Sequence, residues 1–328
     1  MRRRESFALW AAAMAVAGRA HAQGAQDSRS IAILSGFSKA GTAPVIDGLR
    51  RELSKLGWGD DQHIVLLEPR AVGGQYERLP ALAAEIVTLN PSMVVVISVP
   101  ATLAMKQATS TIPIIMMAVG DPVKYGLVAS LARPGGNITG SGYFVNEVGP
   151  KLLQILHEAV PQLSQVAILG NSKNQGNAGY VQALETAGSS LGIKIHNVPL
   201  EGIEHLERAL ETIRRKGAGG IIPAPDPLIF SVLPRVKEFA ISNKVPVVVH
   251  GPIRLLGPGV LIAGEPPEEE RFHVTAVYAD KILKGASPAD LPIWQPVSFE
   301  FGLNLGVAAS LGLTMPPALI ALADKVIE

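Results

Sequence analysis

Residues Gly120–Gly140 read GDPVKYGLVASLARPGGNITG, and this segment carries the strongest single indication of how the chain folds. It follows Ile112–Val119, an apolar run typical of a strand buried in a parallel sheet. Within it, Leu127–Ala132 is predicted to be a short helix-like packing element, and Arg133–Gly136 a turn. The segment holds no nucleophile paired with a base and no cluster of metal ligands. It therefore predicts a ligand-facing loop followed by a passage from one lobe to another.

Short apolar runs alternate with amphipathic segments on both sides of this loop. In 79–89 the apolar residues recur every three or four positions, which indicates one helix face, whereas Met93–Ile97 is continuously apolar like a buried strand. We expect strands at 31–34, 64–67, 93–97, 114–119, 166–169, 193–198, 221–224, 247–249 and 260–263, and helices at 45–56, 79–89, 101–108, 151–160, 181–191, 206–215, 232–241, 272–283, 307–311 and 318–327. The alternation of strands and helices runs to residue 119 and starts again at residue 151. These two arrays predict an α/β fold of two doubly wound parallel-sheet lobes.

Both lobes are expected to be discontinuous in sequence. The chain should pass between them near Thr139–Asn146, Val249–Pro252 and Leu291–Ser298. The first lobe would then comprise residues 28–141 and 251–292, and the second 142–250 and 293–328. A hinge with several crossings suits two lobes that close on a ligand.

The composition excludes several classes of protein. The sequence is 48% hydrophobic and 17% charged, which is typical of folded domains. Its 328 residues are enough for two such domains. The formal net charge is +1, but the first 22 residues contribute +3, so the remainder carries −2 and offers no basic stripe for nucleic acid. The chain has no cysteine, which excludes disulfides and thiolate metal or redox sites.

The N-terminus resembles a secretory signal peptide spanning residues 1–22. Arg2–Arg4 form a charged region, and Phe7–Gly18 form an apolar stretch of 12 residues, shorter than the roughly 20 that span a bilayer. Ala20-His21-Ala22 fits the rule for cleavage, so we expect maturation after Ala22 and a periplasmic product. An N-terminal membrane anchor is the alternative, and export by the general or the twin-arginine route stays open.

The motifs of common enzymes fail on this chain. Gly188–Gly192 reads G-x-S-x-G, but a helix precedes it and a strand follows, the reverse of a nucleophile elbow, so Ser190 is not expected to be a nucleophile. Dinucleotide and phosphate-loop fingerprints are absent, and no histidines have zinc-ligand spacing. We therefore expect no catalytic residues, no metal and no cofactor.

Polar residues at the carboxyl ends of the predicted strands are the candidate ligand-binding residues, because ligands bind there in open α/β sheets. They are Ser35, Phe37, Ser38, Ser98, Ala101, Thr102, Asp121, Tyr143, Asn171, Asp226 and His250. Ser98 and Thr102 flank a helix start, which attracts a carboxylate. Asp226 either pairs with a ligand ammonium or caps the following helix.

Three further interpretations also leave alternatives open. Phe37 and Tyr143 either stack on an aromatic ligand or serve the core and hinge. His250 ends an apolar strand and either lines a cleft or lies elsewhere. Glu268–Glu270 either interact with a helix dipole in its first turn or contribute to recognition by a membrane permease.

Several segments, in this order and spacing, resemble one family: the ABC-transporter substrate-binding proteins of the tryptophan/tyrosine-type uptake group, which have the type I periplasmic-binding-protein fold. The segments are LRRELSKLGW (Leu49–Trp58), Gly73-Gly74, ATLAMKQATSTIPI (Ala101–Ile114), VGDPVKYGLVASLARPGGNITG (Val119–Gly140), ILKGASPADLPIWQP (Ile282–Pro296) and the ending LNLGVAASLGLTMPPALIALADKVIE. The resemblance covers nearly the whole chain.

The resemblance implies an extracytoplasmic, monomeric receptor without enzymatic activity. It would capture a small solute, an amino acid (aromatic in characterised relatives) or a related organic anion, and deliver it to the membrane subunits of an ABC permease. The family pattern implies that Ser98–Thr102 meet the ligand carboxylate and Asp226 its amino group. Pro227, His250 and Ala263–Glu265 depart from the common pattern, which leaves the ligand open. The alternatives are an exported α/β hydrolase-like enzyme and a ligand-sensing module for a signalling receptor.

Overall fold

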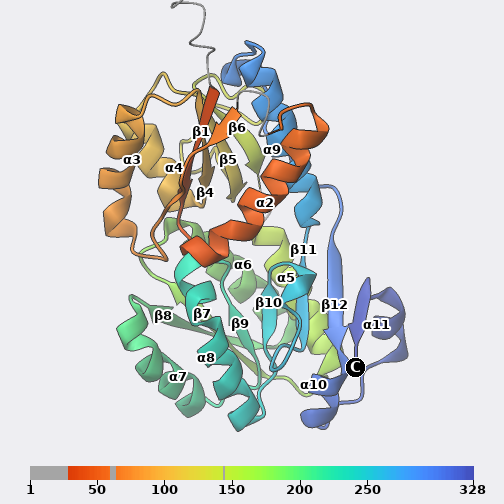
Figure 1. The fold of residues 1–328 in the computed structure, drawn as a ribbon. Helices are drawn as coiled ribbons and strands as arrows, with labels where there is room; N and C mark the ends of the chain where they lie inside the picture. The colour runs from red at the N-terminus through yellow and green to blue at the C-terminus, as the bar shows by residue number, and fades with distance from the viewer. Residues whose placement is uncertain (1–28, 60–63, 143–144) are drawn as a thin grey trace, which may run out of the picture.

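The structure, a computed structural model, describes residues 29–59, 64–142 and 145–328. It has two α/β lobes, one above the other in Figure 1, in which helices cover both faces of the β-structure. This confirms the predicted fold class. The expected signal peptide at 1–22 and the candidate residue Tyr143 lie outside the described residues.

The first lobe is a parallel sheet with strand order β2-β1-β4-β5-β6, in which β3 also pairs with β1. Its elements are β1 (Arg29–Ser35), β2 (Ile64–Leu66), β3 (Arg70–Ala71), β4 (Met93–Ile97), β5 (Ile114–Val119), β6 (Ile138–Gly142), α2 (Lys39–Lys55), η1 (Tyr76–Arg78), α3 (Leu79–Thr88), α4 (Val99–Ala108), α9 (Glu268–Leu283) and η4 (Pro288–Asp290). One apolar core lies under α3 and α4 and another under α2 and α9. Every residue of β4 is therefore buried, as its continuous apolar sequence predicts.

The second lobe joins two sheets, β8-β7-β9 and β10-β11-β12-β13, through a bridge between Ile221 and Val247. Its elements are α5 (Val145–Ala159), β7 (Gln165–Asn171), α6 (Gln175–Leu191), β8 (Lys194–Leu200), η2 (Ile203–His205), α7 (Leu206–Arg215), β9 (Ile221–Pro223), α8 (Pro227–Asn243), β10 (Val248–His250), η3 (Ile253–Leu255), β11 (Ile262–Glu265), β12 (Glu300–Asn304), α10 (Leu305–Ser310), α11 (Pro317–Leu322) and β13 (Lys325–Ile327). β12 runs antiparallel to β11. Two cores again lie on opposite faces, one under α5 and α6 and one under α7 and α8.

The chain passes between the lobes after β6, after β11 and after η4. From the sequence, the second of these passages is predicted at Val249–Pro252, with residues 251–292 in the first lobe. The register instead pairs β11 with both β10 and β12, so the passage follows Glu265 and only α9 and η4 return to the first lobe. The strand predicted at 260–263 and the helix predicted at 272–283 thus belong to different lobes, because the strand completes the sheet of the second lobe while the helix covers the sheet of the first.

Two segments predicted to be helical are wholly or partly non-helical in the structure. Residues 127–132 form bends and irregular backbone after the turn 122–126: Gly126 has φ +62°, and the Leu127 amide donates to the carbonyl of Pro122. Leu127 is nevertheless buried, so the segment packs as expected without being helical. The predicted helix 318–327 ends at Leu322, because β13 pairs in parallel with the edge of β12.

Candidate functional site

A cavity of about 630 Å³ lies between the two lobes, within the usual range for small-molecule sites. It is lined by the carboxyl ends of β4 and β5 from the first lobe and of β10 and β11 from the second. The amino-terminal parts of α2, α6, α8 and α9 complete its wall. This is where parallel α/β sheets bind ligands, because the strand ends and the following helix starts converge there.

One part of the cavity wall is aromatic and apolar. Phe37 follows β1 and Phe230 comes from α8, and their ring centroids are 6.0 Å apart across the two lobes. Val45, Met117 and Leu131 extend this apolar wall. Such a surface accepts an aromatic or aliphatic group by burial and ring contact.

Buried polar side chains from the second lobe and α9 supply the contrasting part of the wall. Glu265 ends β11, and its carboxylate accepts a hydrogen bond of 2.7 Å from the Arg271 guanidinium of α9. His250 ends β10, and its ring centroid lies 5.5 Å from that of Tyr180 on α6. Asn177 of α6 also lines the cavity, and all five side chains belong to buried residues.

Burial sets the charge of the two rings in this polar wall. It lowers the pKa of His250 to about 3, helped by the positive charge of Arg271, so the imidazole is neutral at physiological pH. Burial also raises the pKa of the Tyr180 hydroxyl, which stays protonated. The charged groups of the buried wall are thus Glu265 and Arg271, one of each sign.

Two backbone positions at this cavity are strained. Ser98 has φ +99° and Ala118 has φ +53°, values that residues other than glycine rarely adopt. Both line the cavity at the ends of β4 and β5, and such strain clusters at functional sites. Among the described residues, Ser98 Oγ and the Tyr180 hydroxyl are buried without a hydrogen-bond partner. Both hydroxyls are therefore candidates for contact with a solute.

Four of the predicted site residues line the cavity: Phe37, Ser98, Asp121 and His250. The six others that the structure describes do not: Ser35, Ser38, Ala101, Thr102, Asn171 and Asp226. Several of these six have structural partners instead. The Ser38 hydroxyl caps α2 by accepting from Gly41, and the Thr102 hydroxyl donates to the carbonyl of Ser98. They support the loops from behind the cavity wall.

Asp226 is fully buried and is engaged by protein groups. It caps α8 by accepting a 2.8 Å hydrogen bond from the Leu228 amide, which is the capping alternative left open by the sequence. It also accepts hydrogen bonds from Asn171 (3.2 Å), Asn174 (2.7 Å) and the Tyr76 hydroxyl (2.8 Å). Burial raises its pKa, while these hydrogen bonds oppose the shift. Tyr76 belongs to the first lobe, so Asp226 joins the two lobes.

Glycines allow the lobes to approach closely beside this contact. A Cβ on Gly74, whose φ is +85°, would lie 2.7 Å from Cβ of Leu228 in the other lobe. A Cβ on Gly36 would lie 3.0 Å from Pro227 and 2.5 Å from Ser98 Oγ. Any side chain at either position would force the lobes or the neighbouring groups to shift. The lobes are therefore in a closed arrangement.

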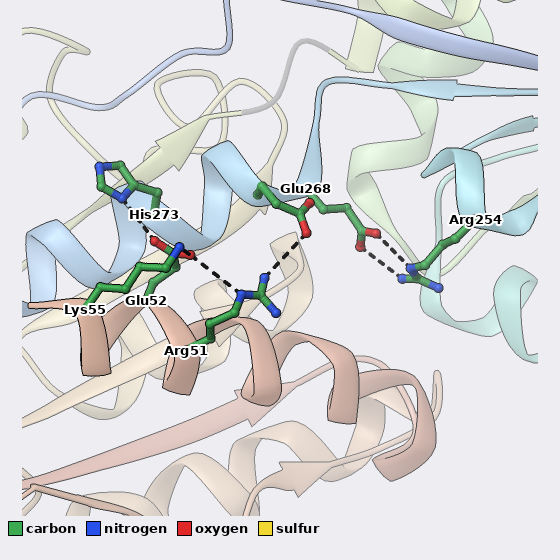
Figure 2. Close-up of polar contacts among 7 residues, drawn as sticks. Arg51, Glu52, Lys55, Arg254, Glu268 and His273 are labelled. Carbon is green, nitrogen blue, oxygen red and sulfur yellow. Dashed lines mark hydrogen bonds and ion pairs between the residues drawn. The ribbon is translucent and has the colours of Figure 1, made fainter. Parts of the chain in front are cut away.

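Polar contacts also connect the segments around the passage after β11 (Figure 2). Arg254 of η3 makes a bidentate pair with Glu268 at the start of α9, with distances of 2.8 and 3.0 Å. Arg51 of α2 contacts Glu269 at 3.4 Å within the first lobe. Glu268–Glu270 occupy the first turn of α9, the position expected for interaction with its dipole.

Residues outside the sequence candidates make up much of the polar wall. Tyr180 directly precedes the helix predicted at 181–191 and lies inside α6, and Arg271 lies inside α9, where the sequence offers no signal for a binding residue. Glu265 follows the predicted strand 260–263 and could have been found as a polar strand end. Phe230 precedes the helix predicted at 232–241, which in fact begins at Pro227.

Ser190 of the G-x-S-x-G match does not line the cavity. The hydroxyl of Ser190 donates to the carbonyl of Thr186 on the exposed surface of α6, which ends at Gly192. Within the described ranges, no three or more His, Cys, Asp or Glu side chains are grouped to hold a metal ion. No helix in the part of the chain that the structure describes is long and apolar enough to cross a membrane.

Comparison with known proteins places the chain in a family. The sequence model of the ABC transporter substrate binding proteins matches residues 30–327. The tyrosine-binding protein of Clostridioides difficile strain R20291 is 26% identical over 215 residues, which are 65% of this chain and 61% of that protein's length.

Solved structures share the fold. The ABC domain from Streptococcus pneumonia in complex with L-Trp has a TM-score of 0.83 at 22% identity, covering 91% of this chain and 99% of that one. A substrate-binding protein with adhesive properties from Clostridium difficile, in its ligand-free open form, has a TM-score of 0.63 at 25% identity with the same coverage. Because the family match extends over nearly all of the described residues, the chain belongs to the ABC transporter substrate-binding proteins, a family of solute-binding proteins rather than enzymes.

Proposed function

We propose that this protein captures an amino acid or a related organic anion between its lobes and delivers it to the membrane subunits of an ABC permease. The observation that carries the proposal is the cavity of about 630 Å³ between the closed lobes, with an aromatic and a polar wall. The names of a tyrosine-binding relative and of an L-Trp complex support a solute with an apolar side chain and a polar head.

The wall residues suggest how the solute is held. Phe37 and Phe230 flank its apolar part, one from each lobe, so that closure completes the contact. Ser98 presents a hydroxyl without a protein partner beside the start of α4, which suits a carboxylate. Asp121 lines the cavity and is exposed, and its carboxylate accepts from the Lys124 amide. For Tyr143 we propose stacking on an aromatic solute, the first of the two alternatives that its sequence position leaves open.

The site of action follows from the N-terminal sequence and from the family. We place the mature protein in the periplasm as a monomer, after removal of residues 1–22. A receptor of this kind presents its closed form to the permease. Discontinuous lobes joined by several passages suit this cycle, because the lobes move as rigid bodies about the connecting segments.

Calorimetry and thermal unfolding of the mature protein with a panel of amino acids, organic anions and sugars test this function. A solute at about 100 times its Kd should stabilise the protein by about 2.7 kcal/mol, and amino acids or organic anions should be the only stabilising class. Small-angle X-ray scattering should show compaction with the same solute. If only sugars bind, or no compound stabilises the protein at millimolar concentration, the proposed function is wrong.

A further inference from the structure

We infer that the buried pair Glu265–Arg271 makes the polar wall specific for a net-neutral head group with both charges, a zwitterion, and against organic anions and amines. The inference rests on the proposed function and narrows it, because that function allows either an amino acid or an organic anion. It assigns the selection to Glu265 and Arg271, two buried residues that line the cavity.

The pair is balanced and withdrawn from solvent. The Glu265 and Arg271 side chains retain 7% and 8% of their exposure, and their closest atoms are 2.7 Å apart. Arg271 also donates to the carbonyl of Pro266 at 3.3 Å. A buried ion pair is costly to desolvate and contributes little net stability, so its position on a cavity wall is better explained by recognition than by folding.

The other buried groups of this wall add no charge. His250 is neutral because burial and Arg271 lower its pKa to about 3, and Tyr180 stays protonated because burial raises its pKa. Asn177 is neutral by its chemistry. A solute with one net charge would therefore bind beside a wall whose own charges already cancel, and its charge would be buried without a counter-charge.

The exposed charges of the cavity lining oppose an anion further. Asp121 and Glu147 line the cavity and are exposed, whereas Arg254 is engaged by Glu268. The cavity as a whole is therefore lined by more acidic than basic side chains. A zwitterion avoids both penalties, because its carboxylate can approach Arg271 while its ammonium approaches Glu265.

The position and the hydrogen bonds of Asp226 support this assignment. Its carboxylate is fully buried, does not line the cavity and accepts hydrogen bonds from protein donors, including Tyr76 and Asn174. Glu265 is the buried carboxylate that lines the cavity. An ammonium in the cavity therefore has Glu265 as its buried anionic partner.

Calorimetry on the unmodified mature protein is the first test. The probes share one aromatic side chain: phenylalanine, its deaminated analogue 3-phenylpropionate and its decarboxylated analogue phenethylamine, with the corresponding sets for tyrosine, tryptophan and leucine. We expect the amino acid of the best set to bind at least about thirtyfold more tightly than either analogue, as expected for removing one partner of a buried charge pair. An analogue that binds within threefold of its amino acid overturns the inference.

Glu265→Gln is the second test, because the amide can still accept from Arg271 while the wall gains a net positive charge. The ratio of amino-acid to deaminated-analogue affinity should fall at least about tenfold. Glu269→Gln is the matched control, because Glu269 lies four residues further along the chain and its side chain is 72% exposed. In this variant the ratio of affinities should not change. If Glu265→Gln does not fold, the double variant Glu265→Gln/Arg271→Gln replaces it, and the same fall in the ratio is expected.

The two proposals fail in different ways. Tight binding of an organic anion without its amino-acid counterpart would leave the transport function in place and overturn the zwitterion assignment. An unchanged ratio in a folded Glu265 variant would also overturn it. Sugar binding alone, or no binding by any solute of the panel, would end both proposals.

Discussion

Replacing Tyr76 by phenylalanine removes one hydroxyl from the contact between the lobes. The hydroxyl donates a 2.8 Å hydrogen bond to Asp226, which is fully buried and belongs to the other lobe. Tyr76 is not among the residues that line the large cavity. The variant therefore tests whether a group that does not touch the solute controls binding through closure.

The expected magnitude follows from that single bond. A hydrogen bond to a charged group contributes about 1.5–3 kcal/mol. Asp226 keeps its bonds to Asn171, Asn174 and the Leu228 amide, so the loss should lie at the lower end, near 2 kcal/mol. If the bond forms only when the lobes close, the closing equilibrium weakens by about thirtyfold, and the apparent affinity falls by up to that factor.

The assay combines calorimetry with small-angle X-ray scattering on Tyr76→Phe and on Tyr278→Phe as the control. Tyr278 undergoes the same chemical change, but its hydroxyl donates to Pro292 away from the contact between Asp226 and Tyr76. The control should bind as the unmodified protein does, and the Tyr76 variant should be more open without solute and bind more weakly. Less than threefold loss of affinity with unchanged scattering would refute the argument.

Two further outcomes are expected from backbone and charge. Gly74→Ala should hold the lobes open and weaken binding, because its Cβ would lie 2.7 Å from Leu228, and scattering should show the more open shape. The control is Gly126→Ala, where φ is also positive but the space is open. This control should lower the stability of the protein without changing its shape or its affinity. His250 takes a proton near pH 3 when folded but near 6.5 when unfolded, so unfolding takes up a proton between these values and acid destabilises the protein there. In denaturant titrations, the free energy of unfolding should fall by up to about 1.4 kcal/mol for each pH unit of acidification in that window because of this group. His250→Gln should remove this slope, whereas the control His205→Gln, at an exposed site, should leave it in place. A slope unchanged in the His250 variant would contradict this.

The sequence was most accurate where local pattern decides structure. The strand Met93–Ile97 and the helix Leu206–Arg215 have the predicted bounds, because continuous apolar burial and a 3.6-residue period are local signals. Predictions failed where distant segments compete. The C-terminal residues 325–327 pair with β12 instead of continuing a helix, since ladder hydrogen bonds to an open edge outweigh helix propensity.

The residues of the candidate site also divide into those that local sequence predicts and those that depend on distant packing. Strand-end reasoning found Phe37, Ser98 and His250, because parallel strands place their carboxyl ends at one edge and their positions follow from the strand assignments. It could not find Tyr180 or Arg271, which lie inside helices and reach the cavity through helix packing.

The sequence alone therefore determined the two-lobed α/β class, the exclusion of enzymatic motifs and four of the strand-end residues that line the cavity, Phe37, Ser98, Asp121 and His250. Only the tertiary structure decided that β11 belongs to the second sheet and that Asp226 binds Tyr76, 150 positions away in the chain. Local periodicity specifies elements because it acts within a few residues. The partner of a buried charge depends on which distant groups share its enclosure, and that is settled only when both lobes have folded and closed.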